Sequence, residues 1–370
     1  MALSNTTDPT TAARALEVAI RRNVANVEEV AVFDVEIPQA SGLSNETVLF
    51  AATWTEDGLP VERRLVARIQ PSGPAVFPRY DFALEFDVMR ALQLHSAVPV
   101  PAMLFQSDDT ELLGAPFMVM ERVEGRVPSD DPPFTAQGWV LDELTSEDRA
   151  RLCENALGTL ATLHAVDIDA VGLGAMADHQ EAGLDGQLAF WRATFDWAAD
   201  GDANPTVEAG FAWLHEHRPA DAGPTVLTWG DARIGNMMFA DDLSVAAVLD
   251  WEMVAVAPAA LDVAWWLFLL RHHTEGIGAP LPEGFPDREE TIARYEELTG
   301  TSLPDLHWFE VFAAVRLASL MHRAGNLMVA AGLLPPDAPM KLNNPASQLL
   351  ARLLGVDAPA GTAQSFIGNR

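Results

Sequence analysis

The spacing of hydrophobic and polar positions changes along this chain, and the change predicts a sheet-rich part followed by a helical part. In residues 11–30, apolar positions recur at the spacing of one helix face, which predicts an amphipathic helix. Short apolar or alternating runs then predict strands, with a turn at Asp57-Gly58 and one helix among them. The expected strands are Val32–Ile37, Thr47–Trp54, Arg63–Gln70 and Phe117–Val123, and the helix is Phe82–Leu94.

From about Ser146 onward the pattern is mostly helical, apart from one hairpin. Strands followed by helices predict an α+β protein with a sheet lobe at residues 1–122 and a helical lobe at residues 123–370. The linker lies near Glu121–Gly125. We expect the proline-rich stretch 127–134 to be an exposed loop, and residues 175–222 to form a helical insertion rich in aromatic side chains.

The hairpin is predicted by two apolar runs, Met237–Phe239 and Val245–Leu249, separated by a polar turn. Three polar residues flank it: Asp231 lies upstream, Asn236 directly precedes the first strand, and Asp250 directly follows the second. Transfer of a phosphoryl group from a nucleotide needs a carboxylate to orient the attacking hydroxyl, and an amide and a second carboxylate to hold magnesium. The three residues supply that set in chain order, although each alone is also typical of a loop edge.

The run from Trp229 to Trp266, which contains this set, resembles the aminoglycoside phosphotransferase and choline kinase-like superfamily, in particular its actinobacterial branch of proteins assigned as aminoglycoside phosphotransferases. The resemblance extends from about Glu36 to the C-terminal helices. It implies a protein-kinase-like bilobal fold, with a small β-sheet N-lobe that binds nucleotide and a large, mainly helical C-lobe that carries catalysis. It also implies that ATP or GTP is the phosphoryl donor and that Mg²⁺ is the metal.

The resemblance assigns roles to residues of the sheet lobe. The turn at Ser41–Thr47 is similar to the nucleotide-positioning loop, although an ordinary turn has the same composition. Arg68 stands where protein kinases place a lysine, and its expected partner is a helix glutamate. The alternative is an exposed strand arginine. The nucleotide-binding candidates are therefore Gly42, Ser44, Asn45, Arg68, Glu85 and, for the adenine, Glu121 and Val123.

In the catalytic loop, Asp231 is the expected base and Arg233 the expected cation beside the transferred phosphate. Asn236 and Asp250 are the expected magnesium ligands, because hard ions prefer oxygen donors. One departure is Trp229, since the family usually has histidine there to hold nearby backbone. An indole N–H can supply part of that role.

Other polar residues nearby have structural interpretations. Asp262 opens an apolar segment and either caps a helix or supports the catalytic loop. We expect His164 to be a core histidine with its hydrogen bonds satisfied. His272-His273 has no third ligand at zinc spacing, so no zinc site is predicted. Glu252 either assists a second ion or lies at the surface.

Composition limits the environment of the protein. The net charge of −30 disfavours nucleic acid and anionic membranes as partners. It suits a cationic acceptor, but it also simply keeps a protein soluble. The longest apolar stretch, Val254–Leu270, is interrupted by Pro258 and Asp262, so no membrane span is expected. With Cys153 as its one cysteine, the chain is expected in the reducing cytoplasm.

The sequence therefore predicts a magnesium- and ATP-dependent kinase for a small molecule that carries a hydroxyl. A nucleotide-binding pseudokinase with a regulatory role is the alternative, and Trp229 and Arg68 are the residues that support it. A hydrolase is disfavoured, because no nucleophile paired with a base accompanies the carboxylates. The aromatic insertion suggests a sizeable, partly apolar acceptor, although aromatic helices usually belong to the core. The sequence does not indicate an oligomeric state.

Overall fold

The computed structural model describes residues 8–38 and 46–364. The chain divides into two compact units, Met1–His95 with Val100–Glu124, and Ser96–Pro99 with Gly125–Arg370. The boundary lies a few residues after the one expected from the sequence.

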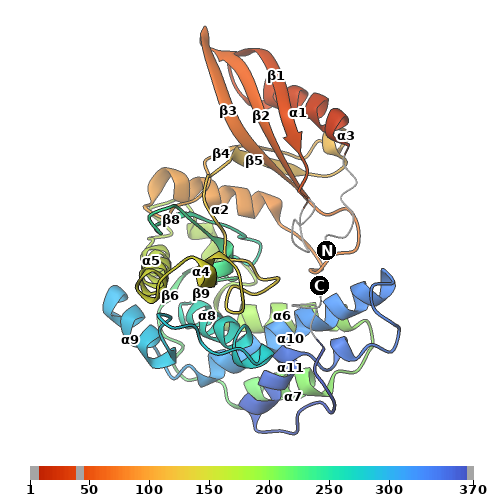
Figure 1. The fold of residues 1–370 in the computed structure, drawn as a ribbon, viewed down its shortest axis with the longest axis vertical. Helices are drawn as coiled ribbons and strands as arrows, with labels where there is room; N and C mark the ends of the chain where they lie inside the picture. Colours follow the sequence, from red (N-terminus) through yellow and green to blue (C-terminus); the bar gives the residue numbers. More distant parts are fainter. Residues whose placement is uncertain (1–7, 39–45, 365–370) are drawn as a thin grey trace. The chain divides into compact units, whose positions relative to one another are not determined.

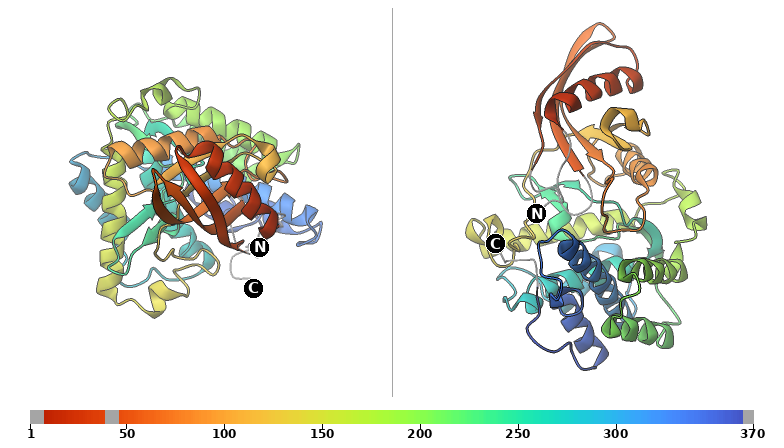
Figure 2. Two further views of the ribbon diagram at one scale, coloured as in Figure 1. Left: turned by 90° about the horizontal axis from the view of Figure 1, so that it is seen from above. Right: turned by 90° about the vertical axis from the view of Figure 1, so that its right-hand side faces the viewer.

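The first unit is built on a five-stranded antiparallel sheet with strand order β1-β2-β3-β5-β4 (Figure 1). Helix α1 covers one face of the sheet, and its buried side chains join those of the strands in one apolar core (Figure 2). The elements of this unit are α1 (Pro9–Asn23), β1 (Val27–Glu36), β2 (Glu46–Glu56), β3 (Leu59–Ile69), α2 (Phe82–His95), β4 (Met103–Ser107), α3 (Thr110–Leu113) and β5 (Phe117–Glu121).

Local sequence explains most of these boundaries. Asp8 caps α1 by accepting a hydrogen bond from the Thr11 backbone N–H at 2.9 Å. Asp57 and Gly58 both have positive φ, which matches the tight turn that joins β2 to β3. The prediction that the first helix reaches residue 30 is wrong. The helix ends at Asn23, and Asn26 turns the chain with φ +58° so that β1 begins at Val27.

The second unit is mainly helical. Helix α10 lies at its centre and contacts α6, α7, α8 and α11. The elements are α4 (Trp139–Asp142), α5 (Ser146–His164), α6 (Gly183–Ala199), α7 (Pro205–Glu216), β6 (Thr225–Thr228), β7 (Met237–Phe239), β8 (Val245–Val248), β9 (Ala255–Pro258), α8 (Ala260–His272), α9 (Arg288–Thr299), α10 (His307–Ala330) and α11 (Pro345–Leu354), with 3₁₀ turns at Gly174–Asp178, Ile234–Asn236, Glu275–Ile277 and Pro339–Lys341.

This unit also contains two short antiparallel strand pairs. The expected hairpin is present as β7 and β8. A second pair, β6 with β9, was not predicted, and it holds the segment before Asp231 against the segment after Asp250. Within the described residues, the structure contains no helix that is both long and apolar enough to cross a membrane.

The close packing of α7 on α10 can be tested at Gly210. A Cβ at this position would lie 2.4 Å from Cγ2 of Val315, a fully buried side chain of α10. We therefore expect Gly210→Ala to lower the free energy of unfolding by about 1–3 kcal/mol, because the added methyl overpacks the core. Denaturant unfolding of the purified protein measures this change.

The matched control is Gly158→Ala in α5. A Cβ there meets no atom within 4 Å. Alanine should then stabilise by up to about 1 kcal/mol through its higher helix propensity. Equal effects at the two positions would contradict the packing argument.

Candidate active site

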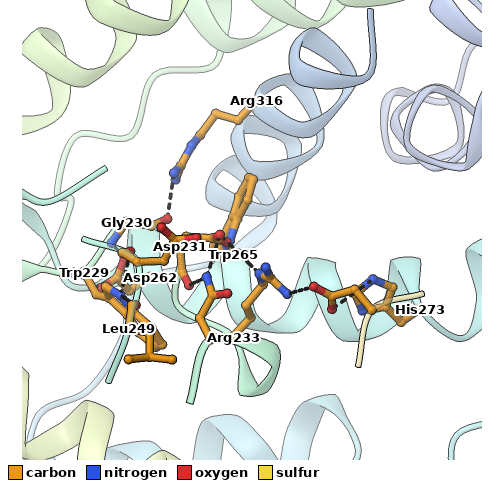
Figure 3. Close-up of polar contacts among 12 residues, drawn as sticks. Trp229, Gly230, Asp231, Arg233, Leu249, Asp262, Trp265, His273 and Arg316 are labelled. Carbon is orange, nitrogen blue, oxygen red and sulfur yellow. Dashed lines mark hydrogen bonds and ion pairs between the residues drawn. The ribbon is translucent and has the colours of Figure 1, made fainter. Parts of the chain in front are cut away.

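The candidate active site is built on the loop between β6 and β7 (Figure 3). The loop bends sharply at Gly230, whose φ is +90°. A Cβ on this residue would lie 2.1 Å from the carbonyl oxygen of Met253, so no other residue fits the bend. The bend predicted from the sequence at Gly230 is therefore present, and it directs the next residue, Asp231.

The Asp231 carboxylate receives hydrogen bonds from three side chains. Trp265 Nε1 donates to Oδ1 at 2.7 Å, and Asn236 Nδ2 donates to Oδ2 at 2.7 Å. Arg233 Nε donates to both oxygens, at 3.1 and 3.2 Å. Because the Arg233 N–H is a single hydrogen shared by both oxygens, the carboxylate receives three hydrogens in all. A carboxylate has about four acceptor positions, so Asp231 keeps the capacity to accept one more hydrogen bond.

Asp262 holds the backbone of the loop through hydrogen bonds. Its carboxylate is fully buried and accepts hydrogen bonds from the backbone N–H of Trp229 at 2.6 Å and of Gly230 at 2.9 Å. It does not cap α8, whose N-terminus carries no side-chain cap. Of the two interpretations of this residue, support of the catalytic loop is the one that the contacts match.

His164 joins the same network and is a satisfied core histidine, as expected. Its Nε2 lies 3.1 Å from Asp262 Oδ2, and its Nδ1 lies 2.6 Å from the Tyr295 hydroxyl. If Nε2 carries the proton and donates to the carboxylate, Nδ1 accepts from the hydroxyl. Burial, and then the charge of Asp262, raise the pKa of Tyr295, so its hydroxyl keeps its proton at neutral pH.

Trp229 fills the position where the family usually has histidine. Its fully buried indole donates from Nε1 to the carbonyl oxygens of Leu249 at 2.9 Å and of Asp250 at 3.1 Å. The indole thus holds nearby backbone, and the backbone that it holds carries Asp250.

Asn236 and Asp250 meet at one end of the β7–β8 hairpin. Met237 pairs with Val248, and the Leu249 N–H donates to the Asn236 carbonyl at 2.9 Å. Asp250 follows with φ +63°, a conformation that is costly for a residue other than glycine and that tends to occur at functional sites.

The side chains of this pair suit a hard cation. Because the Asn236 amide nitrogen is committed to Asp231, its oxygen can face a metal, and the Asp250 carboxylate supplies charge. The described residues contain no group of three or more His, Cys, Asp or Glu side chains placed to hold a metal. Magnesium does not require such a group, since it is bound through one or two carboxylates together with substrate phosphates. Glu252, two residues beyond Asp250, is half-buried.

Arg233 bridges two carboxylates, Asp231 and Asp130. Burial alone would lower the pKa of Arg233, but Asp130 and Asp231 more than offset it and raise the pKa above its usual value. Beside Arg233 lies a small pocket that is lined by Phe134, Arg233, Ile234, Gly235, Trp266, Leu269, Leu270 and His273.

Asp130 belongs to the proline-rich stretch that was expected to be an exposed loop. That expectation is wrong for much of the stretch. Pro128 and Phe134 are buried, Phe134 stacks on Phe285, and Asp130 pairs with Arg233. The ion pair and the aromatic contact fasten this stretch to the catalytic loop and to its surroundings.

The sequence did not identify Asp130 or Trp265 as site residues. Asp130 carried no local signal, since an aspartate among prolines is typical of any turn. Trp265 carried a weak one, because it follows Asp262 by three residues in α8 and helical spacing places both on one face.

In the sheet unit, Arg68 on β3 and Glu85 on α2 form the expected ion pair, with Nη1 3.7 Å from Oε2. The Arg68 side chain is only 15% exposed, which excludes the alternative of an exposed strand arginine. Glu121 ends β5 and pairs with Arg63, and Val123 follows in the linker. Gly42, Ser44 and Asn45 lie outside the described residues. The roles of all these residues in binding nucleotide stay predictions.

The aromatic insertion forms α6 and α7, and part of it belongs to the core. Trp191, Phe195 and Phe211 are buried, and Trp197 and Trp213 are half-buried. Its aromatic content therefore gives no independent indication of an apolar acceptor.

Three comparisons relate the chain to known proteins. The model of the phosphotransferase enzyme family matches residues 37–298. The chain is 28% identical over 276 residues to a probable acyl-CoA dehydrogenase, IBR3, from Arabidopsis thaliana, and 27% identical over 267 residues to acyl-CoA dehydrogenase family member 11 from Homo sapiens. These alignments cover 70% and 69% of this chain but 32% of each relative, so the chain spans about a third of their length.

Solved structures share the fold. A protein from Ralstonia eutropha assigned as an aminoglycoside phosphotransferase aligns with a TM-score of 0.66 at 23% identity, over 92% of this chain and 95% of that one. The aminoglycoside phosphotransferase APH(4)-Ia, in complex with ADP and hygromycin B, aligns with a TM-score of 0.54 at 15% identity, over 94% and 100%. The α+β, kinase-like fold class predicted from the sequence is confirmed.

His272 and His273 lie beside the candidate active site, where His273 lines the pocket next to Arg233. Neither ring nitrogen of His272 has a hydrogen-bond partner in the part of the chain that the structure describes. Burial, and then the neighbouring His273, lower the pKa of His272 to about 3, against a small opposing effect of Asp130. Folded His272 is therefore neutral across the physiological range.

This pKa predicts an acid-dependent loss of stability. Unfolded chains protonate a histidine below about pH 6.5, whereas folded His272 resists protonation down to about pH 3. The unfolded state binds more protons in that window, so the free energy of unfolding falls by about 1.4 kcal/mol for each pH unit below 6.5. We expect His272→Leu to remove this contribution. Urea unfolding at pH 7 and pH 5 measures it, and exposed His215→Leu is the control. An equal loss in all three proteins would contradict the argument.

Proposed function

This chain belongs to the phosphotransferase enzyme family, and we propose that it is an ATP-dependent kinase that transfers the γ-phosphate to a hydroxyl of a small molecule with the help of magnesium. The observation that carries the proposal is the environment of Asp231. Its carboxylate is held by three donors and keeps the capacity for one more hydrogen bond, which suits the acceptor hydroxyl.

In the proposed reaction, the acceptor hydroxyl donates its hydrogen bond to Asp231, which orients the oxygen and takes the proton. The oxygen forms a bond to the γ-phosphorus. The bond from that phosphorus to the β–γ bridging oxygen breaks, and its electron pair stays on the departing ADP. Arg233, beside Asp231, supplies a fixed positive charge near the oxygens that become more negative.

The proposed phosphate-binding residues belong to the first unit, and the proposed metal ligands belong to the second. Arg68, oriented by Glu85, is suited to a phosphate because its planar guanidinium offers several donors. Asn236 and Asp250 would hold magnesium, which, when bound, neutralises phosphate charge. Gly42, Ser44 and Asn45 stay candidates for the phosphate loop. Complexes of APH(4)-Ia with ADP and with AMP-PNP support ATP as the donor.

The pseudokinase alternative rested on Trp229 and Arg68. The contacts of both residues favour an active enzyme, since Trp229 supports the backbone of Asp250 and Arg68 pairs with the expected glutamate. The acidic charge and the single buried cysteine Cys153 support a cytoplasmic protein that does not bind nucleic acid.

The decisive experiment is a screen of acceptors with ATP and magnesium, with ADP release as the readout. The panel should contain an aminoglycoside, a macrolide, an amino alcohol and a hydroxyacyl thioester. Acceptor-dependent turnover supports the kinase. Tight nucleotide binding with no turnover on any acceptor would favour the pseudokinase.

Once an acceptor is known, Asp231→Asn tests the proposed base. The amide keeps the shape of the side chain but cannot take the hydroxyl proton, so kcat should fall by about 10²- to 10⁴-fold. Nucleotide affinity, measured by calorimetry, should change little. Asp241→Asn, in the exposed turn of the hairpin, is the control. Wild-type turnover in Asp231→Asn would remove this residue from the mechanism.

Asp250→Asn tests the metal site. Asparagine tolerates the left-handed backbone at this position, so the change chiefly removes a charge. We expect the gain in ATP affinity that magnesium gives the wild type to fall by about tenfold or more, because ligand charge sets the affinity for a hard ion. Calorimetry with and without EDTA measures that gain. An unchanged gain would rule out Asp250 as a ligand.

A further inference from the structure

A buried arginine contacts the catalytic loop and has no role in the proposed reaction. Arg316 of α10 is 2% exposed, and its Nη2 donates to the carbonyl oxygen of Gly230 at 2.8 Å. Burial lowers the pKa of Arg316 to about 10, and the charges of Asp262 and Asp231 oppose that decrease. The side chain is therefore still a cation at neutral pH.

The guanidinium of Arg316 is packed between aromatic rings. Its Cζ lies 4.2 Å from the ring centroid of Trp265 and 4.8 Å from that of Trp191. Such distances allow a cation–π interaction, which is stronger when the groups are desolvated. Arg316 therefore fixes the plane of the Trp265 ring.

The same ring contacts the proposed base. Trp265 Nε1 donates to Asp231 Oδ1 at 2.7 Å, so the indole lies between a buried cation on its face and a carboxylate at its edge (Figure 3). A cation over the ring draws electron density from it, which makes the N–H a stronger donor to the carboxylate.

We propose that Arg316 and Trp265 are positioning residues that hold Asp231 in the orientation needed to accept the acceptor hydroxyl. Arg316 acts on the loop twice, through the carbonyl of the residue before Asp231 and through the indole that binds Asp231. The proposal rests on the function proposed above, since it assigns a purpose to the orientation of Asp231.

The geometry explains why orientation needs this support. Asn236 holds Oδ2 and Trp265 holds Oδ1, each at 2.7 Å, so the two donors together prevent rotation of the carboxylate. Without the indole N–H, Arg233 is the one remaining side-chain donor to Oδ1 among the residues that the structure describes, at 3.1 Å. Oδ1 is then held by this longer contact in place of the shorter one, and a small misplacement of a reacting group lowers the rate strongly.

Two variants with matched controls separate positioning from general packing. Trp265→Phe keeps an aromatic ring under Arg316 but removes the donor, and Arg316→Met removes the cation. Trp308→Phe is the control for the first, because that buried indole donates to the Leu214 carbonyl at 2.9 Å. Arg323→Met is the control for the second. Arg323 lies on α10, as Arg316 does, and its Cζ is 4.2 Å from the ring centroid of Trp197.

The kinetic experiment measures kcat and the KM for ATP. Trp265→Phe and Arg316→Met should each lower kcat by about tenfold or more, with KM changed by less than about twofold. Arg316→Lys, which keeps the charge, should recover part of the loss, and both controls should match the wild type. Wild-type kcat in both variants, or a rise in KM at constant kcat, would overturn the proposal.

A spectroscopic experiment tests the contact without turnover. The ¹⁵N–¹H indole cross-peak of Trp265 is identified by its absence from the spectrum of Trp265→Phe. It should move in Asp231→Asn and in Arg316→Met, and stay in place in Arg323→Met. A peak that both site variants leave unmoved would overturn the proposal. If no acceptor supports turnover, the proposed function fails, while this experiment still decides whether the two residues hold Asp231.

Thermal unfolding shows which variants are folded. If Arg316→Met does not fold, Trp265→Phe carries the kinetic experiment, and Asp231→Asn and Arg316→Lys carry the spectroscopic one. Wild-type kcat in Trp265→Phe, or a Trp265 cross-peak that stays in place in both Asp231→Asn and Arg316→Lys, overturns the proposal.

Discussion

The arrangement of the site depends on one buried carboxylate. Asp262 accepts hydrogen bonds from two successive backbone N–H groups, those of Trp229 and Gly230, and from the ring of His164. A tight bend leaves such N–H groups without the partners that a helix or sheet would supply, and buried N–H groups without partners are costly. An ionised oxygen is the strongest acceptor available, and its own burial cost is offset by these donors. The bend is thereby held in one conformation, and Asp231 begins where it ends.

The rest of the site is connected to this bend by residues that each make one contact through the backbone and one through the side chain. Trp229 receives support at its N–H from Asp262 and gives support through its indole to the backbone of Asp250. Asn236 donates to Asp231 and, through its carbonyl oxygen, pairs with the strand that leads to Asp250. The proposed base and the proposed metal ligands are thus parts of one hydrogen-bonded structure. A change at any of these residues is transmitted to the others through short, direct contacts.

Much of the site was predictable because its main residues are close in sequence. The spacing of Asp231, Asn236 and Asp250 around a hairpin indicated the fold family and the chemistry that we propose, and the hairpin formed as predicted. The residues that were missed reach the loop from far along the chain. Asp130 and Arg316 are remote in sequence from Asp231, and no local pattern connects them to it. Contacts of this kind are set by tertiary packing, which hydrophobic periodicity does not encode.

Two errors in the predicted fold have different causes, one a single turn residue and the other a long-range strand pairing. The first helix was extended too far because Val24 and the residues after it continue an apolar pattern, whereas Asn26 turns the chain into β1. The pair β6–β9 was missed because each strand is only four residues long and its partner lies far away in sequence.

Trp229 shows how a departure from a family pattern can be accommodated. A histidine at this position has two ring nitrogens, whereas an indole has a single donor. The one Nε1–H here serves two carbonyl oxygens, those of Leu249 and Asp250, and the large ring is fully buried against Trp251, with ring centroids 6.1 Å apart. The substitution therefore exchanges polar contacts for apolar packing at the same place. Because the backbone of Asp250 is still held and Asp231 is still fixed by its own donors, the departure alters how the loop is supported and leaves the proposed reacting groups in place.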